Sequence, residues 1–231
     1  MIRKPRAAEG TRTDGASGLA TAPSAARNLA PILDVLLPRL PSTGDVLELA
    51  SGTGQHIAAF AAHRPDLTFH PTDPDPDRRA AIDARCKGLP NVAEAGDLDV
   101  GVPGWAVKDA AQAIVVVNLL HLISDAEMSV MLDEAAQALS SGGVLAIYGP
   151  FQRGGRLTSD GDAAFHAALQ ADDPAIGYKD LEVVETVLGV LGFTYERHEM
   201  PANNILLIAK KVFVTDGRVI SLERRVERRI P

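Results

Sequence analysis

The sequence has little of what marks a disulfide-stapled, zinc-binding or membrane-spanning protein. Its single cysteine, Cys86, excludes an internal disulfide, and neither a second cysteine nor a close histidine cluster accompanies it as a structural zinc site requires. The longest apolar stretch, residues 113–123, is interrupted by Asn118 and His121. It is far shorter than the roughly 20 residues of a membrane helix. No basic segment followed by an apolar core opens the chain, so we expect a cytoplasmic protein with no membrane partner.

Aromatic residues and positive charge are also scarce in the body of the chain. One Trp, three Tyr and six Phe are too few for a large stacking groove of the kind that binds single-stranded nucleic acid. The formal net charge of −7 includes +3 in residues 1–12 and +4 in residues 210–231, so residues 13–209 carry −14. Such a body repels phosphate backbones. Nucleic acid is therefore disfavoured as a partner, and a small molecule of modest size is the expected substrate.

The apolar pattern predicts one α/β domain over residues 23–211, between a flexible leader at 1–22 and a basic extension at 212–231. From Asp45 onward, short apolar runs alternate with helical stretches, which is typical of a mostly parallel sheet with crossover helices. Seven strands are predicted at 45–50, 67–73, 92–96, 112–118, 142–149, 193–200 and 203–212. Helices are predicted at 55–63, 77–87, 124–139 and 180–191.

Three local signals refine this arrangement. The continuously apolar run from Ile114 to Val117 predicts a central strand that is buried on both faces. Only Pro201-Ala202 separates the last two strands, so their pairing is expected to be antiparallel. An additional helix is predicted behind a Ser24 cap, and Pro31 is expected to kink or divide it.

The basic extension carries its own signals. Asp216-Gly217 suits the tight turn of a hairpin. Leu222, Val226 and Ile230 follow at i, i+4 and i+8, with arginines between them, which predicts an amphipathic helix. Its apolar face would dock either on its own domain or on a second copy in a homodimer.

A turn rich in glycine follows the first strand of the predicted sheet. Gly52 and Gly54 allow the backbone to turn tightly and to approach a ligand, and the helix that follows presents free N–H groups. An acid, Glu48, lies inside the strand, and a second acid, Asp73, ends the next strand. An acidic side chain at that place can accept both hydroxyls of a ribose. The combination indicates a nucleoside-like cofactor.

Two cofactors compete for this geometry. A nicotinamide dinucleotide site has three glycines spaced G-x-G-x-x-G, whereas Ala50 and Ile57 occupy the first and last places here. A carboxylate such as Glu48 suits a cofactor with an ammonium and a sulfonium better than one with a pyrophosphate. The residues therefore favour S-adenosylmethionine (SAM), with NAD as the weaker alternative.

The run from Glu48 to Gly54 resembles motif I of class I SAM-dependent methyltransferases. More narrowly, residues 22–211 resemble the family called methyltransferase-like 26, or domain of unknown function 938. The matching stretches are Pro23 to Asn28, Leu47 to His56, Pro71 to Pro76, Asn118 to His121, Tyr148 to Phe151 and Met200 to Asn204. The resemblance implies the Rossmann-like class I methyltransferase fold, with helices on both faces of a seven-stranded sheet.

The resemblance also implies roles for individual residues. The methionine and ribose portions of SAM would be lined by Glu48, Ser51, Gly52 and Gly54. Asp73 would take the ribose hydroxyls, Asp97 would meet the adenine amino group, and Asn118 would lie beside the methyl group that is transferred. Ala50 departs from the glycine of many class I enzymes.

Methyl transfer is an in-line displacement, so few side chains need to take part in the chemistry. His121 is the candidate base because imidazole titrates near neutral pH, although a packing role is an alternative. Tyr148 is expected either to orient the substrate or to pack in the core. Asn118 and Tyr148-Gly149 stand where a catechol-type metal site needs acids, so transfer without a metal is preferred.

Five further residues are candidates for binding. His56 begins a helix beside the glycine turn and is expected to position the cofactor. Arg27 and Asn28 lie on a segment expected to form a lid, where Arg27 would bind a carboxylate of cofactor or substrate. Asn203 and Asn204 are expected at the substrate by resemblance, with turn roles as the alternative.

A long connection at residues 150–179 is expected to cover the substrate. Phe151 and Phe165 are candidates for a pocket wall or for ordinary core. Taken together, the sequence predicts a SAM-dependent methyltransferase that acts on O, N or C of a small molecule. A non-catalytic SAM-binding module that acts through a protein partner is the alternative, and an NAD-dependent oxidoreductase is the weaker one.

Overall fold

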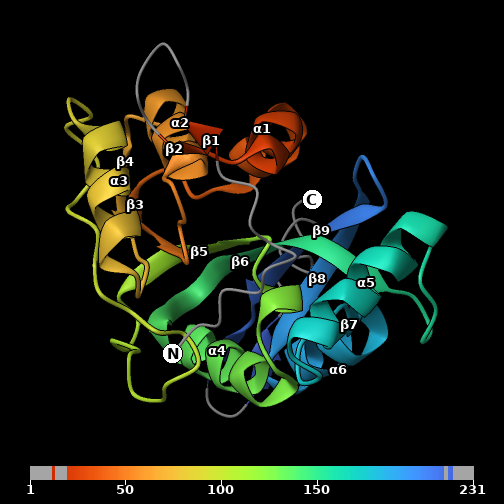
Figure 1. Cartoon of the computed structure of the whole chain (residues 1–231). Coiled ribbons are helices and arrows are strands. Elements are labelled where there is room, and N and C mark those ends of the chain that lie inside the picture. The colour runs from red at the N-terminus through yellow and green to blue at the C-terminus, as the bar shows by residue number, and fades with distance from the viewer. Residues whose placement is uncertain (1–11, 14–19, 216–217, 221–231) are drawn as a thin grey trace.

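A seven-stranded sheet forms the centre of the structure (Figure 1). The computed structural model describes residues 12–13, 20–215 and 218–220. The strands are β3 (Gly44–Leu49), β4 (Leu67–Pro71), β5 (Ala111–Val117), β6 (Leu139–Gln152), β7 (Lys179–Asp180), β8 (Phe193–Glu199) and β9 (Asn204–Lys211). Their order is β4-β3-β5-β6-β9-β8, with β7 paired to β6. Strand β9 is antiparallel to both neighbours and the other pairs are parallel, which confirms the predicted fold class.

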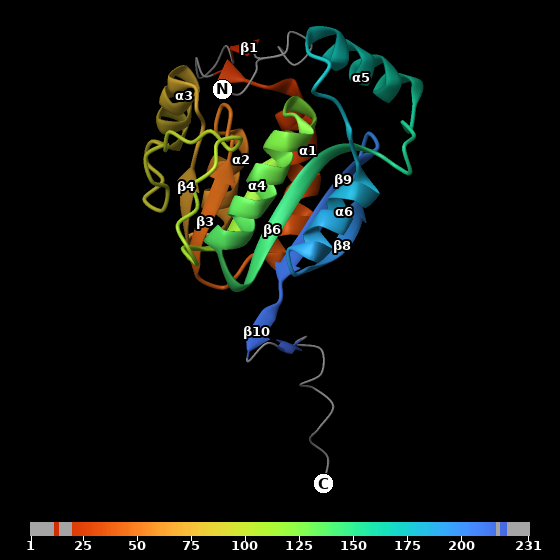
Figure 2. The same cartoon turned by 90° about the horizontal axis from the view of Figure 1, so that it is seen from below.

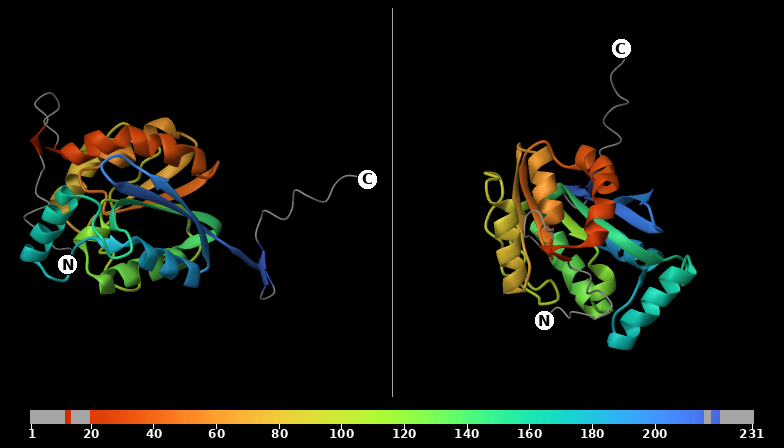
Figure 3. Two further views of the ribbon diagram at one scale, coloured as in Figure 1. Left: turned by 90° about the vertical axis from the view of Figure 1, so that its right-hand side faces the viewer. Right: turned by 45° about the horizontal axis from the view of Figure 1, so that its top comes forward.

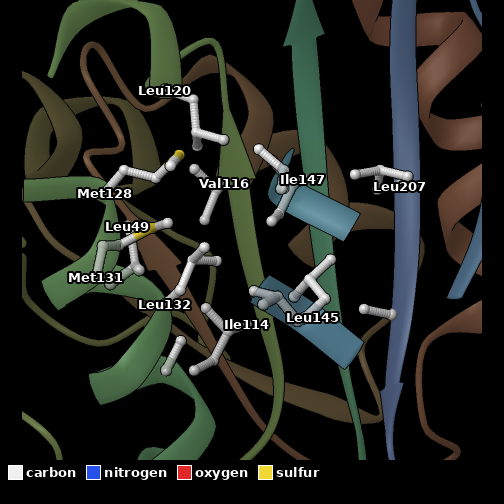
Figure 4. Packing of buried hydrophobic residues seen from close by; sticks show 14 of the residues in the cluster. Leu49, Ile114, Val116, Leu120, Met128, Met131, Leu132, Leu145, Ile147 and Leu207 are labelled. Atoms are coloured by element: carbon white, nitrogen blue, oxygen red, sulfur yellow. The ribbon is translucent and has the colours of Figure 1, made fainter. Parts of the chain in front are cut away.

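Helices cover both faces of this sheet (Figures 1 and 3). One face carries α1 (Pro23–Leu36), α2 (Gln55–His63) and α3 (Pro76–Cys86), and the other carries α4 (Asp125–Ala138) and α6 (Leu181–Val190). Side chains alternate along a strand, so Ala113 and Val115 of β5 pack toward α1–α3 whereas Ile114 and Val116 pack toward α4 and α6 (Figure 4). The apolar run of β5 is thus buried on both faces, as predicted.

The prediction of a continuous strand at 92–96 is wrong. Two isolated bridges join the ends of this segment to the β4 side of the sheet. Pro71 has no N–H with which to continue the ladder, and the N–H of Ala95 donates instead to the carboxylate of Asp83 at 2.8 Å. The seventh strand is β7, which was not predicted.

Helix α1 also differs from its prediction. It begins at Pro23 with Ala22 as N-cap, and no side chain caps it, so Ser24 is not the cap. Proline at the first helical position is favourable because its missing N–H has no helical partner there. The helix continues through Pro31 without division.

The connection after β6 is not an open loop. It contains α5 (Asp160–Asp172), whose N-cap Ser159 accepts a hydrogen bond from the Asp162 N–H. Figure 2 shows α5 beyond the end of the sheet opposite to β10 (Phe213–Thr215). This end holds the carboxyl termini of the parallel strands, where open α/β sheets bind ligands.

Short pairs of strands lie at the two ends of the described chain. β1 (Arg12–Thr13) pairs with β2 (Ala20–Thr21), and β10 pairs with β11 (Arg218–Ile220), each antiparallel. The turn Asp216-Gly217 and the predicted amphipathic helix at Leu222, Val226 and Ile230 lie outside the described residues, so the homodimer stays a prediction. None of the described helices is long and apolar enough to cross a membrane.

Candidate functional site

The turn between β3 and α2 adopts left-handed backbone at three positions. Ala50, Gly52 and Gly54 have φ of 53°, 61° and 74°. A Cβ on Gly54 would lie 3.1 Å from the Cα of Ile82 in α3, whereas a Cβ on Gly52 would meet nothing within 4 Å. The left-handed backbone and the close approach of α3 thus both favour glycine at position 54, and at Gly52 the backbone borders open space.

Replacing Ala50 with glycine is expected to raise the free energy of unfolding by about 0.5–1 kcal/mol. Left-handed backbone costs a residue with a Cβ about 1–2 kcal/mol, and glycine removes this strain from the folded state. The greater conformational freedom of glycine in the unfolded chain offsets about 0.4–1 kcal/mol of that gain. Denaturant unfolding measures the change. Ala168→Gly, at an exposed position inside α5, is the control and should cost about 1 kcal/mol. A loss of stability in Ala50→Gly would contradict the strain argument.

Two carboxylates stand beside this turn. Glu48 is 2% exposed, and its Oε2 is buried without a hydrogen-bond partner. Burial raises the pKa of Glu48 to about 8; a hydrogen bond with Ser51 opposes the rise and the charge of Asp73 adds to it. The two oxygens of Asp73 accept hydrogen bonds from the N–H groups of Gly52 and Asp75, both at 3.0 Å.

Hydrogen bonds of the loop after β4 hold the backbone of the residues that carry these two carboxylates. Thr72 Oγ1 donates to the carbonyl of Glu48 at 2.8 Å, and the N–H of Ser51 donates to the carbonyl of Thr72 at 2.8 Å. Arg79 Nη1 donates to the carbonyl of Asp73 at 2.9 Å and also pairs with Asp97 at 3.1 Å. Asp97, which is largely exposed, therefore lies on the Asp73 side of the turn.

His56 and Asn28 join α2 to α1. His56 Nε2 lies 2.9 Å from Asn28 Oδ1, and both side chains are buried. Burial lowers the pKa of His56 to about 4, so the ring is neutral and donates through Nε2. Asn28 also forms a hydrogen bond with the hydroxyl of Tyr148 on β6, which partly offsets the rise that burial causes in the pKa of Tyr148.

A cavity of about 880 Å³ opens at this end of the sheet. Its walls come from the start of α1, the ends of β5 and β6, helix α5 and the β8–β9 turn. It is lined by Ala22, Pro23, Ser24, Arg27, Asn28, Asn118, His121, Leu122, Tyr148, Pro150, Asp162, Phe165, Tyr178, Pro201, Ala202 and Asn204. Segments far apart in the sequence thus bring six of the predicted site residues to one cavity: Arg27, Asn28, Asn118, His121, Tyr148 and Asn204.

The family described as "Protein of unknown function (DUF938)" matches residues 20–211. The chain belongs to this family. Among solved structures, an O-methyltransferase family protein from Burkholderia thailandensis is similar with a TM-score of 0.67 and 20% identity, over 79% of this chain and 55% of that one. Human N-acetylserotonin methyltransferase, solved with SAM, is similar with a TM-score of 0.65 and 13% identity, over 81% and 51%.

The YcgJ protein from Bacillus subtilis is similar over nearly all of its own length. Its TM-score is 0.64 at 14% identity, over 79% of this chain and 98% of that one. By contrast, this DUF938 chain spans about half the length of the first two structures. At these identities the likeness establishes the fold, which is the one predicted.

His121 lies in the short 3₁₀ helix η3 (Leu120–Leu122), and it is buried. Its Nδ1 is buried without a hydrogen-bond partner. Burial, with a smaller contribution from the charge of Lys179, lowers the pKa of His121 to about 4. The expectation that this imidazole titrates near neutral pH is therefore wrong, because its surroundings keep it neutral.

Phe151 is not part of the cavity wall. It is 1% exposed and belongs to the core on the α4 and α6 face. Tyr148 packs in the core on the opposite face, and the two-residue period of a strand separates side chains three positions apart in this way. The pocket-wall hypothesis for Phe151 is wrong, whereas Phe165 does line the cavity.

The two asparagines of the β8–β9 turn differ in role. Asn204 lines the cavity, and its Nδ2 donates to the carbonyls of Pro201 and Ala202. Asn203 has φ of 59° and its Nδ2 donates to Asp162 at 3.0 Å. Asn203 therefore ties the turn to α5 and does not line the cavity among the described residues.

Sequence reasoning missed Asp162 and Tyr178 as cavity residues. Ser159 and Asp162 have the Ser-x-x-acid spacing of a helix start, which signals α5 but says nothing about a cavity. Tyr178 lies far from every motif. The packing of α5 and of the segment before β7 over the strand ends brings these two residues to the cavity that His121 also lines.

Proposed function

We propose that this DUF938 protein is a SAM-dependent methyltransferase that acts on a small molecule. The observation that carries the proposal is the unpartnered, buried Oε2 of Glu48 at the end of β3. A buried carboxylate without a partner is costly, and the ammonium of a SAM molecule bound beside the turn would compensate it. The similar fold of a methyltransferase solved with SAM supports the proposal, as does the resemblance to methyltransferase-like 26.

The residues beside the turn fit this group. Asp73 would accept the ribose hydroxyls, and the open space at Gly52 lets the ligand approach the backbone. Asp97 would take the adenine amino group, while Arg27, which is exposed on the cavity wall, would pair with the carboxylate of the cofactor. The other residues assigned to the cofactor side are Glu48, Ser51, Gly54, His56 and Asn118.

When bound, SAM would supply a methyl group on a sulfonium: the acceptor's nucleophile would form a bond to the methyl carbon in line as the bond from that carbon to sulfur breaks, and S-adenosylhomocysteine would leave. The chain's own residues align the acceptor and exclude water. His121, whose ring is neutral and whose buried Nδ1 has no hydrogen-bond partner, would accept the proton of the acceptor's nucleophile. Tyr148, oriented by Asn28, and Asn204 would position the acceptor. No step in this scheme requires a metal.

Calorimetric titration with SAM and S-adenosylhomocysteine tests the proposal. We expect micromolar binding that Asp73→Ala weakens by at least about tenfold, because the variant loses a charge-assisted hydrogen bond to the ribose. Asp77→Ala, at an exposed acid in the first turn of α3, is the matched control and should bind normally. Thermal unfolding of each variant separates lost binding from lost folding.

Three results would change the conclusion. A protein that binds neither ligand is not a methyltransferase of this kind. Binding of NAD(H) in place of SAM would support the oxidoreductase. Binding of SAM without formation of S-adenosylhomocysteine on a broad acceptor panel would favour the non-catalytic module.

A further inference from the structure

One buried carboxylate on the cavity wall has no role toward the cofactor. Asp162 is 9% exposed and lies in the first turn of α5. Its Oδ1 accepts from the Tyr178 hydroxyl at 3.1 Å. Its Oδ2 accepts from Asn203 Nδ2 at 3.0 Å and from Ser159 Oγ at 2.7 Å. All three donors are neutral, and no ion pair involves Asp162 among the residues that the structure describes.

The hydrogen bonds of Asp162 leave room for another donor. An ionised carboxylate has about four acceptor positions, and the protein fills three of them. The neutral donors hold the side chain in place without cancelling its charge. Asp162 is therefore a fixed negative group with remaining capacity for a ligand.

The other charged groups around the cavity do not neutralise the negative charge of Asp162. Within the described chain, Arg27 is the only other lining residue with a full charge at neutral pH, and the proposed function assigns it to the cofactor. His121 is neutral because burial lowers its pKa to about 4. Lys179 follows Tyr178 in the sequence, but its ammonium pairs with Asp125 at 2.8 Å. Among the described residues that line the cavity, Asp162 is thus the one with a full negative charge.

Two aromatic rings stand on the same wall as Asp162. The ring centroids of Phe165 and Tyr178 are 6.1 Å apart at an interplanar angle of 70°, and Phe165 lies 5.8 Å from the His121 ring. Aromatic faces attract cations. A carboxylate with aromatic neighbours is a combination that suits an organic ammonium group.

We propose that the acceptor carries a protonated amine, which Asp162 binds beside Phe165 and Tyr178 while a separate nucleophile faces His121. The proposal rests on the proposed function and names its substrate class. The net charge of −14 on residues 13–209 favours the approach of such a cation. Asp162 is then the residue that selects amine-bearing acceptors over neutral or acidic ones.

The test compares three probes that share a phenol ring and differ in charge: tyramine, 2-(4-hydroxyphenyl)ethanol and 3-(4-hydroxyphenyl)propanoate. Their affinities are measured by calorimetry near pH 7.5, with and without saturating S-adenosylhomocysteine. We expect the amine to bind about 10- to 100-fold more tightly than the neutral probe, as a charge-assisted hydrogen bond predicts. Asp162→Asn should abolish this preference, and Asp160→Asn, at an exposed acid in the same helical turn, should keep it.

A second variant keeps the proposal testable if Asp162→Asn does not fold. Phe165→Leu should reduce the preference for the amine by about 2- to 30-fold through loss of the cation–π contribution, without weakening the neutral probe to the same degree. The proposal is overturned if none of the three probes binds, if the amine and the neutral probe bind equally, or if the preference for the amine survives in folded Asp162→Asn. Titration with S-adenosylhomocysteine alone decides the proposed function separately, since it does not depend on any probe.

Discussion

Replacing His121 with alanine is expected to lower kcat by about 10²- to 10⁴-fold, the usual contribution of a general base, and to leave the affinity for SAM unchanged. The ring lies on the cavity wall after β5, and its buried Nδ1 has no hydrogen-bond partner. A neutral imidazole in that place is free to accept a proton. Release of S-adenosylhomocysteine on the acceptor that the panel identifies measures kcat, and calorimetry measures SAM affinity.

The pH dependence separates this role from that of an ordinary titrating histidine. Burial lowers the pKa of His121 to about 4, so the base stays deprotonated at higher pH and protonates only near pH 4. A histidine with the usual pKa of about 6.5 would instead give a rate that falls as pH drops through that value. The histidine-dependent part of kcat should therefore remain constant from pH 7 to about pH 5.

His63→Ala is the matched control for the His121 variant. His63 is exposed on α2, and its Nδ1 bonds only to the carbonyl of Ala59 in the same helix. This variant should keep full activity. Full activity in His121→Ala would remove the histidine from the mechanism, and a loss of SAM affinity equal to the loss of kcat would indicate a structural role.

Much of the fold could be predicted because the buried strands carry their pattern in consecutive residues. The run from Ile114 to Val117 predicted a central strand, and its residues are buried against helices on both faces. Similarly, Gly52 and Gly54 predicted a tight turn from composition alone, since glycine is the residue that adopts positive φ without strain. Signals of this kind act over a few residues and survive in any tertiary context.

Other elements could not be predicted because their cause lies elsewhere in the chain. The segment 92–96 has the composition of a strand, but Pro71 on the neighbouring strand removes the donor that its ladder needs. Helix α5 gave no periodic apolar signal because it buries few side chains: Asp162 and Leu169 are the buried residues of this helix. Its role as a cavity wall follows from packing over strands that are distant in sequence.

The residues of the candidate site also fall into those that the sequence could predict and those that it could not. Motif residues such as Glu48 and Asp73 follow strands directly, and parallel strands bring such positions to one edge. Phe151 follows the strand predicted at 142–149, which makes it a candidate for the pocket wall, but β6 extends through it and places it on the face that packs against α4 and α6. The environment of His121 was also invisible in sequence, because burial by α5 and the segment before β7 sets its pKa.

Affinity for SAM is expected to rise with pH, by up to about tenfold per unit below pH 8. In the ligand-free protein burial raises the pKa of Glu48 to about 8, so the side chain is protonated at pH 6 to 7. The ammonium of SAM favours the ionised carboxylate, so binding at those pH values must release a proton. Calorimetry near pH 6, 7 and 8, in two buffers with different ionisation enthalpies, measures both the affinity and the number of protons released.

Glu48→Gln should abolish this pH dependence and weaken binding near pH 8 by about 10- to 100-fold, because the amide cannot carry the charge that the ammonium needs. Glu94→Gln, at an exposed position, is the control and should keep the slope. Binding that is independent of pH in the unmodified protein would contradict the assignment of Glu48 to the ammonium.

The same carboxyl group makes the stability of the ligand-free protein change in the opposite direction. Glu48 holds its proton up to a pH of about 8 in the folded chain, whereas in the unfolded chain it ionises near its ordinary pKa of about 4.3. The folded state therefore binds more protons between these two values, and the contribution of Glu48 to the free energy of unfolding decreases as pH rises through this interval. Glu48→Gln should remove that decrease. The ammonium of SAM would offset the free-energy cost of burying the charged Glu48 at high pH. Stabilisation of the protein by saturating SAM should therefore be greater near pH 8 than near pH 6. A stabilisation that does not change with pH would show that Glu48 does not face the ligand.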